Sequence, residues 1–312
     1  MLVALLAQPA AAQTYPAKPV RIIVTFPPGG PADFVGRALA QKLTEAWGQQ
    51  VVVDNRSGAG GVVGVEVAAR AGPDGHTLLQ GQSGGMSINP ALLPKLSYDP
   101  FRDFAPISLL VVNPQILVAH PSLPVKSVKE LVALAKRRPG QINYASAGHG
   151  TTQHLGMEML KVMTEIDLVH VPYKGTSLML ADLFSGQVSL NFTSMPAVLP
   201  HVKTGKLRSI AVGSPKRSPA APEVPTVAES GVLGFEYVAW YGLFAPAGTP
   251  KGIISQLNAQ VVKALSEPDL SQRLASQGAE PSPGTPEGLA RYMREDHERW
   301  KKVIKASNIR VE

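Results

Sequence analysis

The 312-residue sequence contains no cysteine. That absence excludes disulfide bonds, thiolate metal sites, cysteine nucleophiles and lipid attachment to an N-terminal cysteine. Beyond the N-terminus the sequence also lacks any run of about 20 apolar residues, so it predicts no membrane-spanning helix. The net charge is +7, yet the basic residues are scattered and are not interleaved with aromatic residues. We therefore expect no nucleic-acid partner, while a mildly positive field favours anionic small molecules.

The composition that is present is typical of an exported globular protein with many turns. Apolar residues make up 44% of the chain, which also has 29 glycines and 28 prolines. Residues 1–12 form a short apolar stretch that ends in Ala10-Ala11-Ala12, the small residues of a signal-peptide cleavage site. We interpret residues 1–12 as the remainder of a secretory signal peptide and expect the mature chain to begin near Gln13.

The rest of the chain is organised around a turn between a buried strand and a helix. Residues 20–25 are mostly β-branched and predict a strand, whereas Val35, Leu39 and Leu43 recur at helical spacing. Between them, glycines allow backbone amides at the positive end of the helix to approach an anion closely. An ordinary βα connection is the alternative for this turn taken alone. Its candidate ligand-binding residues are Phe26, Pro27, Pro28, Gly29, Gly30 and Asp33.

A second turn of small residues follows the expected strand 143–145 and precedes a helix that begins near Gln153. It offers backbone amides together with hydroxyl groups. Each hydrogen bond to a charged group contributes about 1.5–3 kcal/mol, so about four would supply the roughly 8 kcal/mol of a micromolar ligand. Two such turns facing each other across a cleft would bind an anion without any catalytic group. The candidate residues of the second turn are Ser146, Ala147, Gly148, His149, Gly150, Thr151 and Thr152.

Two unusually long apolar runs, residues 107–119 and 235–245, predict strands that cross between two domains. We expect domain 1 to comprise residues 13–107 and 236–312, and domain 2 to comprise residues 108–235. The last helices, which begin near Gly252 and Pro286, should pack back on domain 1. A cleft between two βα halves is the expected consequence.

One rival function is an exported serine hydrolase that uses Ser83. The segment Gly81-Gln82-Ser83-Gly84-Gly85 matches the G-x-S-x-G pattern of such enzymes and follows an expected strand. The helix that the pattern requires next is not expected, because Pro90 and Pro94 interrupt the following residues. A loop that lines a ligand site, or a purely structural loop, is the preferred interpretation.

Two further motifs are interpreted as structural. Residues 58–64 resemble a dinucleotide-binding fingerprint, but Val63 occupies the position of its third glycine, so we expect no nucleotide cofactor. His149 and His154 are five residues apart, which would place their rings on different faces of a helix. We expect no metal site there, and no cofactor elsewhere.

Taken along its length, the sequence resembles the Bug receptors, the periplasmic solute-binding components of tripartite tricarboxylate transporters. The residues that carry this resemblance cover nearly the whole expected mature chain: Tyr15-Pro16, Lys18-Pro19, residues 26–30 with Asp33 and Arg37, residues 58–61, 73–78 and 98–100, Asp103-Phe104, and residues 146–155, 171–175, 225–229 and 245–250.

The resemblance implies an α/β protein with the two-domain Venus-flytrap fold of type II periplasmic-binding proteins, each domain a mixed sheet flanked by helices. It also implies that the protein is not an enzyme. Expected instead is a monomeric periplasmic receptor that binds a small carboxylate, namely a di- or tricarboxylate, an aromatic carboxylate or an acidic amino acid, and delivers it to membrane permease subunits. The carboxylate would be held by residues 26–30 and 146–152. Further candidates for the pocket wall are Ser83, Tyr173, Thr193 and Trp240.

Overall fold

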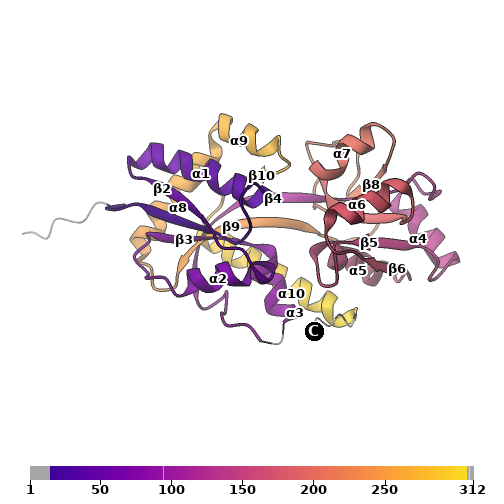
Figure 1. Cartoon of the computed structure of the whole chain (residues 1–312), viewed down its shortest axis with the longest axis horizontal. Coiled ribbons are helices and arrows are strands. Elements are labelled where there is room, and N and C mark those ends of the chain that lie inside the picture. The colour runs from indigo at the N-terminus through magenta and orange to yellow at the C-terminus, as the bar shows by residue number, and fades with distance from the viewer. Residues whose placement is uncertain (1–14, 94, 308, 310–312) are drawn as a thin grey trace, which may run out of the picture.

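The computed structural model describes residues 15–93, 95–307 and 309, and in it the chain forms two lobes joined by two long strands (Figure 1). The interpretation of residues 1–12 as a signal peptide falls outside the described residues. Within them, no helix has both the length and the apolar character that crossing a bilayer requires.

Domain 1 is a mixed sheet covered by helices on both faces. Its strands β1 and β2, and β1 and β3, pair in parallel, and β3 then pairs antiparallel with β9, one of the two connecting strands. The strands are β1 (Val20–Val24), β2 (Val51–Asn55), β3 (Thr77–Gln82) and the short β10 (Glu280–Pro281). The helical segments are α1 (Pro31–Trp47), η1 (Ala59–Gly61), α2 (Val62–Ala69), η2 (Gly84–Ile88), α3 (Asn89–Leu92), α8 (Lys251–Ser266), α9 (Pro268–Ala275) and α10 (Pro286–Ala306).

Domain 2 repeats this plan with the other half of the chain. Strand β5 pairs in parallel with β6 and β7, and β7 and β8 pair antiparallel with the connecting strand β4. The strands are β5 (Asn143–Ser146), β6 (Val169–Pro172), β7 (Leu190–Ser194) and β8 (Arg208–Val212). The helices are α4 (Val128–Arg137), α5 (Thr152–Thr164), α6 (Thr176–Ser185) and α7 (Met195–Lys203). The expected mixed sheets and two-domain fold are therefore confirmed.

The two crossings are β4 (Phe104–Ala119) and β9 (Val238–Pro246). They pair with each other, from Phe104 opposite Pro246 to Pro114 opposite Val238. Residues of β4 up to Val111 belong to the cores of domain 1, and those from Ile116 onward belong to the cores of domain 2. We keep the residue boundaries 107/108 and 235/236 as a proposal.

Helix α10 departs from the sequence expectation. Its first half packs on domain 1 through Leu289 and Met293, as expected. Its second half carries Trp300, Val303 and Ile304 into the core of domain 2 that also contains residues of α5. The helix thus lies along the junction between the domains and contacts both of them, below the connecting strands in Figure 1. An amphipathic pattern reveals a buried face, but it does not reveal which domain covers that face.

Candidate ligand-binding site

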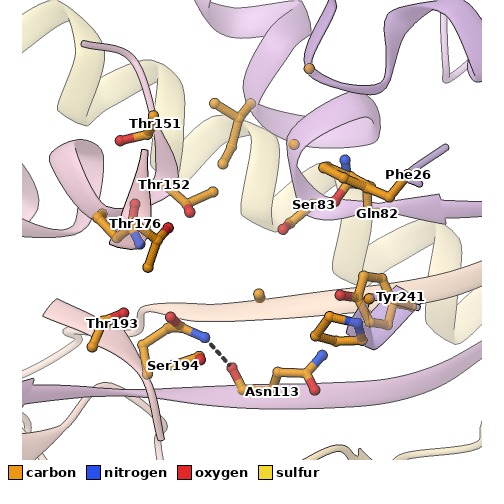
Figure 2. Close-up of a pocket in the computed structure, with 18 of the residues that line it drawn as sticks. Phe26, Gln82, Ser83, Asn113, Thr151, Thr152, Thr176, Thr193, Ser194 and Tyr241 are labelled. Carbon is orange, nitrogen blue, oxygen red and sulfur yellow. Dashed lines mark hydrogen bonds between the residues drawn. The ribbon is translucent and has the colours of Figure 1, made fainter. Parts of the chain in front are cut away.

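A cavity of about 900 Å³ lies between the two domains and is lined by both of them and by both connecting strands. Figure 2 shows Phe26, Gln82 and Ser83 on the domain 1 side, Thr151, Thr152 and Thr176 on the domain 2 side, and Asn113 and Tyr241 on the crossings. The cavity therefore lies where the sequence predicted a cleft.

The first turn forms one wall of this cavity through Phe26, Gly29 and Gly30. Gly30 is the N-cap of α1 and Pro31 its first residue, so no side chain caps the helix. The amide of Gly30 and the first-turn amide of Ala32 have no hydrogen-bond partner among the described residues. Such amides at a helix N-terminus are available to an anion. Pro27 and Pro28 do not line the cavity.

Asp33 holds this turn from behind and is not itself part of the cavity wall. Its Oδ2 accepts hydrogen bonds from the amide of Gly29 (2.9 Å) and from Nε of Arg37 (2.9 Å). Its Oδ1 accepts one from Nδ2 of Asn55 (3.0 Å), which also donates to the carbonyl of Phe26 (3.0 Å). Burial alone would raise the pKa of Asp33, but these hydrogen bonds outweigh it and hold the pKa below its ordinary value. Asp33 is thus an ionised support of the turn.

The second turn faces the cavity only through its later residues, His149, Gly150, Thr151 and Thr152. Thr151 is the N-cap of α5 and accepts the amide of His154. Ser146, Ala147 and Gly148 do not line the cavity.

Several donors that the sequence offered in this turn are used within it. The hydroxyls of Ser146 and Thr151 both donate to the carbonyl of Gly148, and the amide of Gly150 donates to Nδ1 of His154 (3.1 Å). The backbone amides of His149, Thr152 and Gln153 have no hydrogen-bond acceptor among the described residues. Fewer donors therefore face a ligand here than the sequence suggested. They form a compact group at the start of a helix.

Three histidines gather behind this turn, which corrects the expectation that His149 and His154 point apart. The rings of His154 and His170 are stacked, with centroids 3.9 Å apart and an interplanar angle of 8°. The ring of His149 is nearly perpendicular to both, with centroids 5.6 Å and 4.9 Å away. Burial lowers the pKa of His154 to about 4 and that of His170 to about 3. Both stacked rings are therefore neutral at neutral pH.

The three imidazoles bring one nitrogen each within 4.8 Å of the others, which raises the question of a metal ion. A bound metal lies close to the plane of each imidazole at about 2.0–2.1 Å from the nitrogen. Two stacked, parallel rings cannot both meet that condition around one ion unless one of them turns. Nδ1 of His154 also accepts the Gly150 amide, and Nε2 of His170 lies 2.6 Å from the Ser146 hydroxyl. This arrangement does not fit a metal site, and the expectation of none stays a prediction.

Of the four further candidates for the pocket wall, the structure places two in the cavity. Ser83 and Thr193 line it, both nearly fully buried. Tyr173 instead packs against a core of domain 2 and donates its hydroxyl to Asp182 (2.7 Å).

Trp240 is the fourth candidate, and its assignment to the wall is wrong. Its side chain is fully buried in domain 1, where the indole Nε1 donates to Asp296 (2.8 Å). Successive side chains of a strand point to opposite faces, so its neighbour Tyr241 lines the cavity instead.

The segment after Ser83 is helical, contrary to expectation, because η2 and α3 follow it directly. The strand–turn–helix context of the hydrolase pattern is therefore present. Within the described part of the chain, however, no hydrogen bond joins Ser83 to a histidine or a carboxylate. The hydrolase interpretation thus lacks a base that would activate the hydroxyl.

Sequence reasoning missed most of the uncharged polar side chains of the cavity. Asn113 and Gln115 could have been found, because they interrupt an otherwise apolar crossing strand. Of the others, Gln82 ends β3, Asn89 and Gln153 lie at helix starts, and Gln277 lies on a loop. The amide side chains that line the cavity are Gln82, Asn89, Asn113, Gln115, Gln153 and Gln277. Among the described lining residues there is no aspartate, glutamate, lysine or arginine.

Two mixed sheets, two crossing strands and a polar cavity between the domains define a two-domain solute-binding protein. Comparison with known proteins identifies the family. The family described as tripartite tricarboxylate transporter family receptor matches residues 35–309, so the chain belongs to that family. The receptors of this family are periplasmic. The expected kinship with the Bug receptors is thereby confirmed.

Individual relatives agree with this assignment. Protein BugT of Bordetella pertussis is 37% identical over 307 residues, which cover 98% of this chain and 94% of that protein. Two solved structures of Rhodopseudomonas palustris proteins are also similar. One holds adipate (TM-score 0.80, 37% identity, 95% of this chain and 99% of that one). The other is MatC with bound malate (TM-score 0.75, 35% identity, 93% and 100%).

Proposed function

We propose that this chain is a periplasmic receptor that binds a small organic acid between its domains and delivers it to the permease subunits of a tripartite tricarboxylate transporter. The observation that carries the proposal is the pair of helix starts, α1 without a side-chain cap and α5 with the cap Thr151, which present unpartnered amides to one cavity from opposite domains. The adipate and malate in similar structures support a carboxylate as the ligand. No step of this function requires catalysis, and we propose that the protein acts as a monomer.

The composition of the cavity wall narrows the class of ligand. An ammonium group needs a carboxylate partner when it leaves water, and none lines the cavity among the described residues. A tricarboxylate would bring three negative charges to a wall without lysine or arginine. The wall does offer apolar surface, for example Phe34, Ile88 and Leu92. These features favour a mono- or dicarboxylate on an uncharged aliphatic or aromatic body.

Binding should close the two domains on the ligand. A ligand carboxylate can accept hydrogen bonds from the amides of α1 and of α5 at the same time only when the two helix starts approach each other. The two connecting strands are the only described links through which the sheets of the domains are continuous, so they form the hinge. Closure of this kind is a common response of two-domain receptors to their ligands.

The test is a thermal-shift panel on protein that has been unfolded and refolded to remove any ligand retained from the host. The panel holds straight-chain dicarboxylates, aromatic carboxylates, tricarboxylates and the matched pair glutarate and glutamate, which differ only by an ammonium group. A ligand at about a hundred times its dissociation constant adds about 2.7 kcal/mol to the free energy of unfolding. We expect glutarate to stabilise more than glutamate. No stabilisation by any carboxylate would refute the proposal.

A further inference from the structure

The cavity wall contains one histidine among the described residues, His149. Among the described lining residues, only His149 and Tyr241 are ionisable. Burial raises the pKa of Tyr241 to about 12, so that hydroxyl stays neutral. Imidazole side chains ordinarily titrate between pH 5 and 8. His149 is therefore the one described lining residue whose side chain is positively charged when protonated.

The position of His149 relates it directly to an anion. It lies on the turn before α5, next to the group of unpartnered amides formed by its own residue, Thr152 and Gln153. The side chain is exposed, and its ring nitrogens have no hydrogen-bond partner within the described residues. Its ring is held edge-to-face against His154 and His170. The ring is thus held in place beside the cavity, with one nitrogen within 4.8 Å of nitrogens of His154 and His170.

The charged groups around His149 leave it without a counter-ion in the protein. The two rings packed against it, His154 and His170, are neutral because burial lowers their pKa values. Behind them, Nζ of Lys161 pairs with Glu158 (2.8 Å), which also accepts the hydroxyl of Tyr144 (2.6 Å). These two charges offset each other. A protonated His149 would therefore find its counter-ion in the cavity.

We propose that His149 recognises the second carboxylate of a dicarboxylate ligand, and that binding of this ligand is coupled to protonation of the ring. The inference rests on the proposed receptor function. The first carboxylate is held by the helix amides and the second by the imidazolium, so a monocarboxylate makes only the first contact. Because the ligand stabilises the protonated ring, the complex takes up a proton and affinity increases as pH falls.

The experiment measures dissociation constants by calorimetry at pH 8.5, 7.5 and 6.5, where carboxyl groups, which ordinarily titrate near pH 4, stay ionised. The probes are two matched pairs of di- and monocarboxylate, adipate with hexanoate and terephthalate with 4-methylbenzoate. All buffers contain EDTA, so that no metal ion joins the three imidazoles. If the carboxylate favours the protonated ring by about tenfold, the dissociation constant of the dicarboxylate falls as the pH decreases from 8.5 to 6.5, by about tenfold at most. That of the monocarboxylate stays constant.

Variants separate charge from structure. His149→Gln keeps a neutral donor, and we expect it to bind the dicarboxylate with no pH dependence. His149→Arg has a permanent positive charge, and we expect tight, pH-independent binding of the dicarboxylate. His201→Gln, a histidine outside the cavity wall, is the control and should retain the wild-type pH dependence. Calorimetry in buffers of different ionisation enthalpy should show proton uptake in the wild type and none in His149→Gln.

The outcomes distinguish the inference from the function on which it rests. Carboxylate binding without pH dependence in the wild type overturns the inference alone. Equal pH dependence for the di- and monocarboxylate, or pH dependence that survives in His149→Gln, also overturns it, since the proton then goes elsewhere. No response to any carboxylate of the thermal-shift panel removes the proposed function, and the inference with it.

Discussion

Replacing Asp33 with alanine should destabilise the protein because this carboxylate supports the first turn of the cavity. Its side chain is buried, with a residue exposure of 4%, and accepts hydrogen bonds from the Gly29 amide and the Asn55 side chain. Hydrogen bonds to charged groups contribute about 1.5–3 kcal/mol each, so losing these two costs about 3 kcal/mol or more. The partner Arg37 is exposed and can be hydrated instead.

The sign of the pH dependence follows from the direction of the pKa shift. The pKa of Asp33 is lower in the folded protein than its ordinary value, which is near 4. The ionised carboxylate therefore contributes its full stabilisation at pH values above about 4. The contribution is lost as pH falls through the folded-state pKa. The difference between wild type and Asp33→Ala should therefore be largest at neutral pH and should shrink below pH 4.

Urea denaturation at several pH values measures this difference as a free energy of unfolding. Asp74→Ala is the matched control, because Asp74 is a half-exposed carboxylate paired with Lys18 on the surface. That change should cost less than about 1 kcal/mol. A loss below 1 kcal/mol for Asp33→Ala, or a loss that is the same at pH 7 and pH 3, would refute the reasoning. In the ligand panel, Asp33→Ala should also bind more weakly, because the turn is no longer fixed.

Three further changes test other parts of the structure. Gly156→Ala should cost about 1–3 kcal/mol in urea denaturation, because an added Cβ would lie 2.3 Å from the buried ring of Tyr237. Gly252→Ala, also in a helix but with nothing within 4 Å, should instead stabilise by about 0.5–1 kcal/mol. Burial raises the pKa of Asp296 to about 6, so wild-type stability relative to Asp296→Asn should fall by about 2 kcal/mol between pH 4 and 7. Ser83→Ala should leave any trace esterase activity unchanged; its loss would support the hydrolase interpretation.

The features that the sequence could predict are those that depend on local pattern. The β-branched run before Phe26 and the proline–glycine turn are sufficient to place a strand, a turn and a helix. The length of the apolar run from 107 to 119 predicted a crossing because a single small sheet does not need so long a strand. Ser83, directly after β3, and Thr193, next to the last residue of β7, both line the cavity, but the sequence offered them only as candidates that the resemblance implied.

Features that depend on pairing between distant segments were not predictable. His170 reaches the second turn because β6 pairs with β5 in a register that places it opposite Tyr144. The pairing register of β5 and β6 cannot be inferred from the sequence alone. Trp240 and Tyr241 are adjacent on a strand buried on both faces, and nothing in the sequence says which face borders the cavity. The internal hydrogen bond between Gly150 and His154 likewise appears only once the turn is folded.

Strand β4 has a consequence for how the whole chain unfolds. Its first half is packed into the cores of domain 1 and its second half into those of domain 2, and both halves belong to one uninterrupted run of backbone. Helix α10 connects the same two cores from behind. Neither domain can melt without removing a strand or a helix from the other. The protein is thus one cooperative unit in thermodynamic terms although it is two domains in shape, and heating should produce a single calorimetric peak.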